Sequence, residues 1–382
     1  MARNIGKGKA FNDNEMKLCI VYNFAQHYRA GIFKLISEAY DCDFYFGNSM
    51  GDVKKLDYSL LQGKVTEMHI SRRYGLSYQK GVVRLLRKPY TTYLMLGDTR
   101  SVSMWIFLLL SKFYPKKKVY LWSHGWYGKE SGLERWMKRL FFRLPSGGVF
   151  LYGNYARVLM VKDGFNPDKL FTIHNSLDYE HQVEVREQLS PTDVYKEHFG
   201  NANPNLFFVG RLTPVKKLDM VLRAMAQLLE RGQEYNMTFI GDGTVRESLE
   251  ALTRELGLEK NVWFYGACYD EKVLGELIYN ADLCVAPGNI GLTAMHTLVF
   301  GTPALTHDDF PHQMPEFEAI REDETGSFFK NDNVESMAES ISRWFAEKGG
   351  QRESVRQACM NEIDTSWTPQ FQLKVLQSVI HE

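Results

Sequence analysis

The segment from residue 281 to residue 303 constrains the fold more than any other part of the chain. It has an apolar run typical of a strand (Ala281–Pro287), a glycine-containing loop, a helix, and then a Gly301-Thr302-Pro303 stop before another strand. A loop that opens a helix presents free backbone N–H groups, which suit a phosphate group. Glycines at 288 and 291 would let that backbone come close to a ligand. The segment therefore predicts an α/β unit with a candidate diphosphate site.

A second unit of the same kind lies upstream. The apolar strand that begins near Phe207 ends at Gly210, Arg211 follows, and Lys216 comes just before a predicted helix over Leu218–Leu229. Two cations next to the start of a helix can neutralise a pyrophosphate, because Arg offers a bidentate fork and Lys a point charge. The alternative is a solvated basic turn.

Two more strands in this half end in glycine. The strand that begins at Met237 runs into the turn Gly241-Asp242-Gly243, and the strand that begins at Val262 ends at Gly266. Strands that alternate with helices indicate a parallel, doubly wound sheet.

The order and spacing of these motifs resemble the donor half of the group 1 retaining glycosyltransferases (family 4), over about Leu206 to Trp367. The resemblance implies the GT-B fold: two Rossmann-like doubly wound α/β domains that face each other across a cleft, with a C-terminal helix that crosses back to the first domain. It also implies a nucleotide-diphosphate sugar as donor substrate, retention of the anomeric configuration, and no metal or other cofactor.

The chain departs from the family pattern in one loop. The family usually carries Glu-x7-Glu there, and alignment on Gly301-Thr302-Pro303 places Gly288 at the first Glu and His296 at the second. A His can still bond a ribose hydroxyl through a ring nitrogen, whereas Gly288 offers only backbone. The alternative for His296 is an ordinary helix residue.

The predicted site residues fall into three groups. For the reaction itself, the candidates are His124, Arg211 and Lys216. The predicted donor-binding residues are Gly210, Gly241, Asp242, Gly243, Gly266, Asn289, Gly291, Leu292, Thr293, His296 and Glu318. The predicted acceptor-binding residues are Arg29, Gly31 and Gly125.

His124 and Glu318 have specific arguments behind them. His124-Gly125 follows a strand at its carboxyl end, where open α/β sheets bind ligands, and the resemblance implies contact with the donor sugar; a core His is the alternative. Glu318 matches, by its spacing to Gly326, the acidic residue that the family carries after a glycine-rich loop. A metal cluster at His307, Asp308 and His312 is disfavoured, because three ligands from one loop are hard to arrange.

The N-terminal half also alternates strands and helices, so two domains of ordinary size are expected. We predict an N-terminal acceptor-binding domain over 1–177, a C-terminal nucleotide-sugar-binding domain over 178–365, and a C-terminal helix over 366–382 that packs back on the first domain.

Composition excludes several classes of protein. The net formal charge is zero, which argues against a nucleic-acid-binding protein. The five cysteines are scattered without a Cys-x2-Cys pair, so neither a zinc site nor a disulfide framework is indicated. The first 17 residues lack the apolar core of a signal peptide, and a cytoplasmic protein is expected.

Contact with a membrane stays open. The segment Leu133–Arg143 mixes four basic residues with Trp, Met, Leu and Phe, and Lys80–Lys88 adds Arg84, Arg87 and Lys88 among Val and Leu. Such a segment can lie on anionic lipid at the inner face of the plasma membrane, or it can pack on a sheet with a solvated rim.

The function predicted from the sequence is transfer of a sugar from a nucleotide-diphosphate donor to an acceptor hydroxyl, on a bacterial surface glycan or a lipid-linked sugar. Two alternatives stay open. Gly288 in place of Glu motivates a GT-B protein that has lost catalysis and acts as a binding or scaffold subunit. The same fold could also carry a sugar-nucleotide epimerase.

Overall fold

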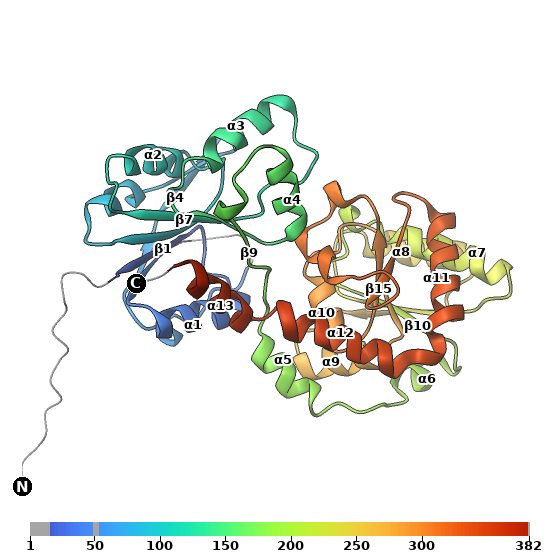
Figure 1. The fold of residues 1–382 in the computed structure, drawn as a ribbon. Coiled ribbons are helices and arrows are strands. Elements are labelled where there is room, and N and C mark those ends of the chain that lie inside the picture. The colour runs from blue at the N-terminus through green and yellow to red at the C-terminus, as the bar shows by residue number, and fades with distance from the viewer. Residues whose placement is uncertain (1–15, 49–52, 381–382) are drawn as a thin grey trace, which may run out of the picture. The chain divides into compact units, whose positions relative to one another are not determined.

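The computed structural model describes residues 16–48 and 53–380. Within these residues the strands form one seven-stranded sheet, one six-stranded sheet and one hairpin. Figure 1 shows helices on both faces of each large sheet. The chain separates into two compact units, one built mainly from the N-terminal part and the other mainly from the C-terminal part.

The first large sheet has the strand order β3-β2-β1-β6-β7-β8-β9. Its interior strand β1 (Leu18–Tyr22) is buried at all five positions and pairs in parallel with β2 and β6. A strand covered on both faces has to be apolar throughout, which the sequence Leu-Cys-Ile-Val-Tyr satisfies. The other strands of this sheet are β2 (Cys42–Gly47), β3 (Val65–Met68), β6 (Thr92–Leu96), β7 (Lys118–Ser123), β8 (Gly148–Leu151) and β9 (Leu170–Thr172).

Helices cover this sheet, and a hairpin lies beside it. The helices are α1 (Ala30–Ala39), α2 (Val102–Ser111), α3 (Gly132–Phe142) and α4 (Asn154–Lys162), with 3-10 turns η1 (His27–Arg29), η2 (Tyr58–Leu60), η3 (Val82–Arg87) and η4 (Pro167–Lys169). The antiparallel hairpin of β4 (Ile70–Arg73) and β5 (Leu76–Gln79) was not predicted from the sequence. Figure 1 places α2 and α3 on one face of the sheet and α1 on the other.

The second large sheet is parallel, with the order β12-β11-β10-β13-β14-β15. Its strands are β10 (Asn205–Val209), β11 (Asn236–Ile240), β12 (Val262–Gly266), β13 (Leu283–Ala286), β14 (Ala304–His307) and β15 (Gly326–Phe329). Its helices and turns are α5 (Tyr179–Arg186), α6 (Val194–Phe199), η5 (Pro214–Lys216), α7 (Asp219–Glu230), α8 (Arg246–Glu255), α9 (Glu271–Asn280), α10 (Thr293–Val299), η6 (Phe310–His312), η7 (Pro315–Ala319), α11 (Val334–Lys348), η8 (Gly349–Gln351) and α12 (Arg352–Ser366). A last helix, α13 (Pro369–Val379), follows α12.

Helix α7 illustrates why these segments fold as they do. Its buried residues include Val221, Ala224, Met225 and Leu228, which recur at the three- and four-residue spacing of one helix face. That face is buried, and the charged residues Asp219, Arg223 and Glu230 are exposed to solvent. The two Rossmann-like α/β domains predicted from the sequence are therefore confirmed.

The two compact units do not meet at a single boundary such as the one predicted after residue 177, because each unit is built from several segments of the chain. The first compact unit runs to Ser123, takes in Leu133–Phe150, and includes the chain from Leu373 onward. The second takes His124–Gly132 and Leu151–Gln372. The end of α13 thus groups with the first unit, where the Tyr120 hydroxyl donates to the carbonyl of Val379 at 3.4 Å.

The second sheet reverses its strand order between β10 and β13, which are neighbours. Crevices at such a switch point, outside the carboxyl ends of the strands, are where open α/β sheets bind ligands. The loop after β10 carries Arg211 and Lys216, and the loop after β13 carries Gly288 and Gly291. The fold therefore brings together the two segments that the sequence singled out.

Candidate functional site

Lys216 joins the two loops at the switch point. Its ammonium donates to the backbone carbonyl of Asn289 at 2.6 Å and to the side-chain carbonyl of Asn289 at 3.0 Å. Burial lowers its pKa, and the carboxylate of Glu316 is among the groups that oppose this shift. The positive charge is thus fixed against the glycine loop by neutral acceptors, which leaves it available to an anion.

Gly288 occupies its position because no side chain fits there. A Cβ atom at residue 288 would lie 2.1 Å from the carbonyl oxygen of Val215 and 2.8 Å from the Cα of Lys216. The backbone N–H of Gly288 also donates to the carbonyl of Lys216 at 3.0 Å. The departure from the family's glutamate therefore has a structural reason: the loop after β10 packs directly on the loop after β13.

Gln313 holds the glycine loop from the other side, and the sequence reasoning missed it. Its side-chain carbonyl accepts the N–H of Ile290 at 2.9 Å, and its amide donates to the Thr306 hydroxyl at 2.9 Å and the His307 carbonyl at 3.1 Å. The side chain is buried. Every hydrogen-bonding group of the amide is used within one clamp, and nothing in the local sequence signals it.

The start of α10 offers backbone donors. Among the residues that the structure describes, the N–H groups of Gly291, Leu292 and Thr293 have no recorded acceptor. Thr293 is anchored because its hydroxyl donates to the Val209 carbonyl at 2.9 Å. Arg211, one residue beyond Gly210, is exposed. The predicted donor residues at these positions therefore lie at one edge of the sheet, with their donor groups open.

The predicted glycines allow close approach of backbones at this edge. Gly210, Gly241 and Gly266 all have positive φ angles. A Cβ at Gly241 would lie 1.9 Å from the carbonyl oxygen of Gly210, and one at Gly243 would lie 2.2 Å from that of Leu212. Asp242 caps its own turn, because its carboxylate accepts the N–H of Gly243 at 2.7 Å.

One ring nitrogen of His296 lies close to residues of two neighbouring helices. Its Nδ1 lies 3.2 Å from the amide nitrogen of Gln182 and 4.0 Å from the carboxylate of Glu271. Burial lowers its pKa. Nδ1 thus contacts residues of α5 and α9, and the predicted ribose contact stays a prediction.

Glu318 caps a helix. Its two carboxylate oxygens accept the N–H groups of Asn154 and Tyr155, each at 2.7 Å, at the start of α4. Burial raises its pKa to about 7, although the two N–H donors favour the charged form. Both oxygens thus hold the start of α4, and the predicted contact with a donor stays a prediction.

Glu316 is a residue that the sequence reasoning did not name. It is buried, and one oxygen accepts the side-chain amide of Asn175 at 2.8 Å. It lies near Lys216 and Tyr127: its charge opposes the lowering of the Lys216 pKa by burial, and it adds to the rise that burial causes in the pKa of Tyr127. The sequence has two glutamates in this turn, Glu316 and Glu318, and only Glu318 was predicted as a site residue.

His124 lies among aromatic rings in the second unit. Its ring centroid is 4.7 Å from that of Tyr152 and 5.9 Å from that of Tyr127. The following loop is held by Glu130, which accepts the N–H groups of Tyr127 and Gly128 at 2.7 and 2.9 Å. Gly125 has a positive φ, and a Cβ there would lie 2.7 Å from the side chain of Leu151.

The predicted acceptor residues Arg29 and Gly31 belong to the first unit. Arg29 is buried, and its guanidinium lies 5.5 Å from the ring of Tyr22 and 5.6 Å from that of Trp122. Gly31 lies in the first turn of α1. Arg29 therefore has a defined aromatic environment, while its role in binding an acceptor stays a prediction.

A cavity of about 420 Å³ adjoins the glycine loop. It is lined by Gly288 and Asn289 together with polar and charged groups from neighbouring loops, namely Lys129, Lys217, His307, Asp309, His312, Asn331 and Asp332. Side chains of these types can donate and accept hydrogen bonds, as the hydroxyl groups of a sugar require. Among the described residues, no group of three or more His, Cys, Asp or Glu side chains is placed to hold a metal ion.

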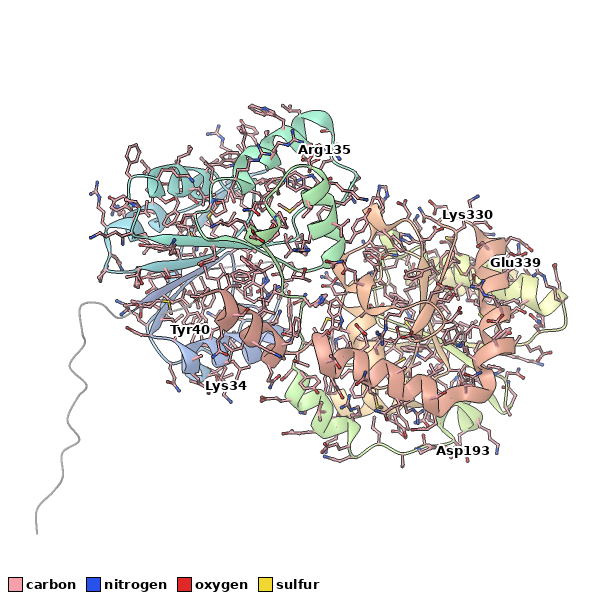
Figure 2. All side chains as sticks on the ribbon, in the orientation of Figure 1. Lys34, Tyr40, Arg135, Asp193, Lys330 and Glu339 are labelled. Carbon is pink, nitrogen blue, oxygen red and sulfur yellow. The ribbon has the colours of Figure 1, made fainter. Side chains whose placement is uncertain are left out.

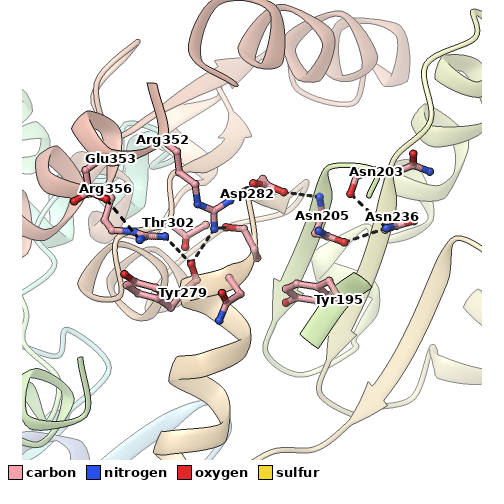
Figure 3. Close-up of polar contacts among 12 residues, drawn as sticks. Tyr195, Asn203, Asn205, Asn236, Tyr279, Asp282, Thr302, Arg352, Glu353 and Arg356 are labelled. Atoms are coloured by element: carbon pink, nitrogen blue, oxygen red, sulfur yellow. Dashed lines mark hydrogen bonds and ion pairs between the residues drawn. The ribbon is translucent and has the colours of Figure 1, made fainter. Parts of the chain in front are cut away.

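A larger cavity of about 460 Å³ lies at the opposite edge of the same sheet, at the amino ends of β10 and β13. Arg352 there donates to Asp282 and to the carbonyls of Tyr279 and Ala281, and Figure 3 shows these polar contacts. Asn236 donates to Asn205 at 3.1 Å. These polar groups already pair with one another. Open α/β sheets bind ligands at the carboxyl ends of their strands, and this cavity lies at the amino ends, so it is not the candidate ligand site.

Comparison with known proteins identifies the family of the chain. Residues 164–360 match the family described as "Glycosyl transferases group 1". The chain belongs to this family. None of its described helices is both long enough and apolar enough to cross a membrane.

Individual relatives match part of their own length. The chain is 26% identical over 196 residues to an uncharacterized glycosyltransferase of Methanocaldococcus jannaschii, covering 50% of this chain and 46% of that protein. It is 24% identical over 185 residues to a 2-deoxystreptamine glucosyltransferase of Streptomyces kanamyceticus, covering 46% and 45%. The chain thus spans less than half the length of these relatives.

Solved structures share the fold along nearly the whole chain. Anabaena HepE in complex with UDP superposes with a TM-score of 0.69 at 13% identity, over 95% of this chain and 99% of that one. The lipopolysaccharide outer core galactosyltransferase WaaB superposes with a TM-score of 0.68 at 14% identity, over 96% and 100%.

Proposed function

We propose that the protein transfers a sugar from a nucleotide-diphosphate donor to an acceptor hydroxyl. The proposal rests on the contact between the two loops at the switch point, where the Lys216 ammonium donates a hydrogen bond to Asn289. The backbone N–H groups of Gly291 and Leu292 follow Asn289 in the same loop and have no acceptor among the described residues. A fixed cation and free amides at the carboxyl end of a parallel sheet suit a diphosphate. Membership of the group 1 glycosyl transferases supports the same chemistry.

In this proposal the chain's own groups stabilise the leaving nucleotide. As the glycosidic bond breaks, negative charge grows on the diphosphate, and Lys216 and Arg211 lie at the edge where it would sit. Charge held in place beforehand lowers the barrier because it needs no reorganisation. The polar cavity beside Gly288 and Asn289 would then receive the sugar.

The finer parts of the proposal concern stereochemistry and substrates. We propose retention of configuration without a metal ion, with the cations of the chain neutralising the diphosphate. We propose a carbohydrate or lipid-linked acceptor, and a cytoplasmic enzyme that works at the inner face of the plasma membrane. The UDP bound in the structure of Anabaena HepE makes UDP the first nucleotide to try.

A thermal-shift screen tests the proposal. The protein is mixed with UDP, GDP, ADP or CDP, with and without Mg²⁺, and the screen is repeated on Arg211→Ala. A ligand that binds only the folded state raises the melting temperature, so one diphosphate should stabilise the wild type without Mg²⁺ and lose this effect in the variant. The matched control is Arg254→Ala, another exposed arginine, which lies in α8.

The rival function is a binding or scaffold subunit without catalysis, and Gly288 is the observation that favours it. The absence of room for any side chain at residue 288 shows that a glutamate contact to the sugar cannot come from this position. Transfer of labelled sugar to any acceptor, or hydrolysis of a bound donor, would reject this alternative. Nucleotide binding without either reaction would favour it.

A further inference from the structure

We propose that the first unit carries a membrane-docking surface for anionic lipid, formed by α2, α3, η3 and the β4–β5 hairpin. The proposal does not depend on the proposed sugar transfer, because it rests on a different set of residues. These four elements contact one another, expose large apolar side chains and carry an excess of Lys and Arg.

Helix α3 turns an apolar stripe toward solvent. Leu133, Trp136, Met137 and Leu140 recur at the spacing of one helix face, and all are exposed, Leu133 by 71% and Trp136 by 58%. An amphipathic helix in a soluble protein normally buries that face. Here the residues buried beneath α3 are others, Lys138, Phe141 and Phe142.

Helix α2 repeats the pattern. Val102, Ile106 and Leu109 are exposed along one side, and Phe113, just beyond the helix, is 79% exposed. The tip of the hairpin adds Tyr74, which is 87% exposed, and Leu76. Of the large exposed apolar side chains in the described residues, two-thirds fall between Tyr74 and Leu140.

Side-chain and backbone contacts connect these elements. The rings of Trp105 in α2 and Phe141 in α3 lie 5.0 Å apart. The N–H of Ser77 in the hairpin donates to the Arg100 carbonyl at 2.9 Å, just before α2. A groove of about 410 Å³ runs between η3 and the end of α2, with Leu86, Leu110 and Phe113 among its lining residues.

The same region carries a large excess of positive charge. Over residues 70–123 and 133–150, all of the first unit, the sequence has fifteen Lys and Arg but two Asp and Glu, although the whole chain is neutral. Arg84 and Arg87 line the η3–α2 groove, and Arg135 is exposed on α3, where Figure 2 labels it. Among the described residues none of these three has a recorded ion-pair partner.

Apolar side chains interleaved with cations select one occupant. A polyanion such as a nucleic acid would be bound by the cations but would gain nothing from exposed Leu, Trp and Phe. A second copy of the chain would cover the apolar residues but would bring two strongly positive surfaces together. A bilayer with anionic headgroups matches both properties, with the aromatic rings at the headgroup level. The η3–α2 groove then seats a lipid phosphate on Arg84 and Arg87.

Vesicle flotation tests the proposal. The full chain is mixed with vesicles of phosphatidylcholine alone or with phosphatidylglycerol added, and the bound fraction is measured. Binding should require the anionic lipid. Charge reversal in Arg84→Glu/Arg87→Glu should weaken it by about fivefold or more per residue. The pair Phe113→Ser/Trp136→Ser should weaken it by roughly tenfold or more, because two large apolar side chains lose their burial.

Control variants and melting temperatures distinguish loss of the docking surface from unfolding of the protein. The pair Leu229→Ser/Tyr269→Ser removes exposed apolar residues of the second unit and should bind vesicles as the wild type does. Each variant should keep the wild-type melting temperature and its shift with nucleotide, so failure here is distinct from failure of the proposed sugar transfer. Bromine-labelled acyl chains should quench part of the tryptophan fluorescence, and Trp136→Phe should remove that part.

Three results would overturn the proposal. One is equal binding to neutral and anionic vesicles or to neither. Another is loss of binding in the charge variant but full binding in the apolar variant, together with competition by soluble polyanion, which would identify a polyanion surface. The third is a wild-type dimer that becomes a monomer in Phe113→Ser/Trp136→Ser, which would identify an interface between copies.

Discussion

At the scale of single residues, Gly288 explains the departure from the family pattern. The carbonyl of Val215 occupies the space that a side chain would need, so the residue type follows from the packing of two loops. His296 was predicted from the same alignment, yet it bonds Gln182 and lies near Glu271. Close contact between two loops therefore explains the residue type at 288, whereas the contacts of His296 are with residues of neighbouring helices.

Substitution of Gly288 tests this explanation. Gly288→Ala should lower the free energy of unfolding by about 1–3 kcal/mol, because its methyl group would be forced against the Val215 carbonyl. Gly288→Glu should cost at least as much and should not restore a sugar contact. Chemical denaturation measures both. Gly350→Ala, where a Cβ meets nothing within 4 Å, is the matched control. Stability of Gly288→Ala equal to that control would contradict the explanation.

At the scale of elements, two polar side chains hold loops and helix ends in place. Gln313 ties the glycine loop after β13 to the end of β14, and Glu318 receives the first N–H groups of α4. Neither role could be read from the sequence, because each partner lies in a segment distant along the chain or in an irregular loop. The strands and glycines were predictable because their patterns are local.

Removal of the Gln313 clamp should affect stability and ligand binding together. Gln313→Ala should lower the free energy of unfolding by about 1–3 kcal/mol, since it leaves buried polar partners unpaired. It should also weaken binding of a nucleoside diphosphate, because the loop loses its support. Denaturation and calorimetry measure the two effects, with exposed Gln357→Ala as control. Weaker stability with unchanged affinity would show that the clamp does not position the loop for the ligand.

Glu318 should make stability depend on pH. Burial raises its pKa from 4.5 to about 7 in the folded state, so the folded state holds the proton more tightly than the unfolded state. Its contribution to stability is therefore present at low pH and is lost as pH rises from about 4.5 to about 7. The melting temperature of the wild type should fall relative to Glu318→Gln across this range. Glu339→Gln, at an exposed residue that Figure 2 labels, should track the wild type at every pH. A constant difference between wild type and Glu318→Gln would contradict the assignment.

At the scale of the whole molecule, the sequence predicted the two parallel sheets and the edge at which the motifs gather. Buried strands such as β1 and the glycines that end β10, β11 and β12 carry that information. The β4–β5 hairpin was missed because its strands are short and largely exposed, so no apolar alternation marks them. The return of the chain's last residues to the first unit was predicted only through the family resemblance.

The central claim is that the loops after β10 and β13 bind the diphosphate of a nucleotide. Titration calorimetry tests it most directly, by comparing the nucleoside diphosphate with its monophosphate on the wild type and on Lys216→Met. The account predicts that the wild type prefers the diphosphate by at least about tenfold, which corresponds to one charge-assisted contact, and that Lys216→Met loses most of this preference. Equal affinity for the two nucleotides in the wild type, or an unchanged preference in Lys216→Met, would contradict the account.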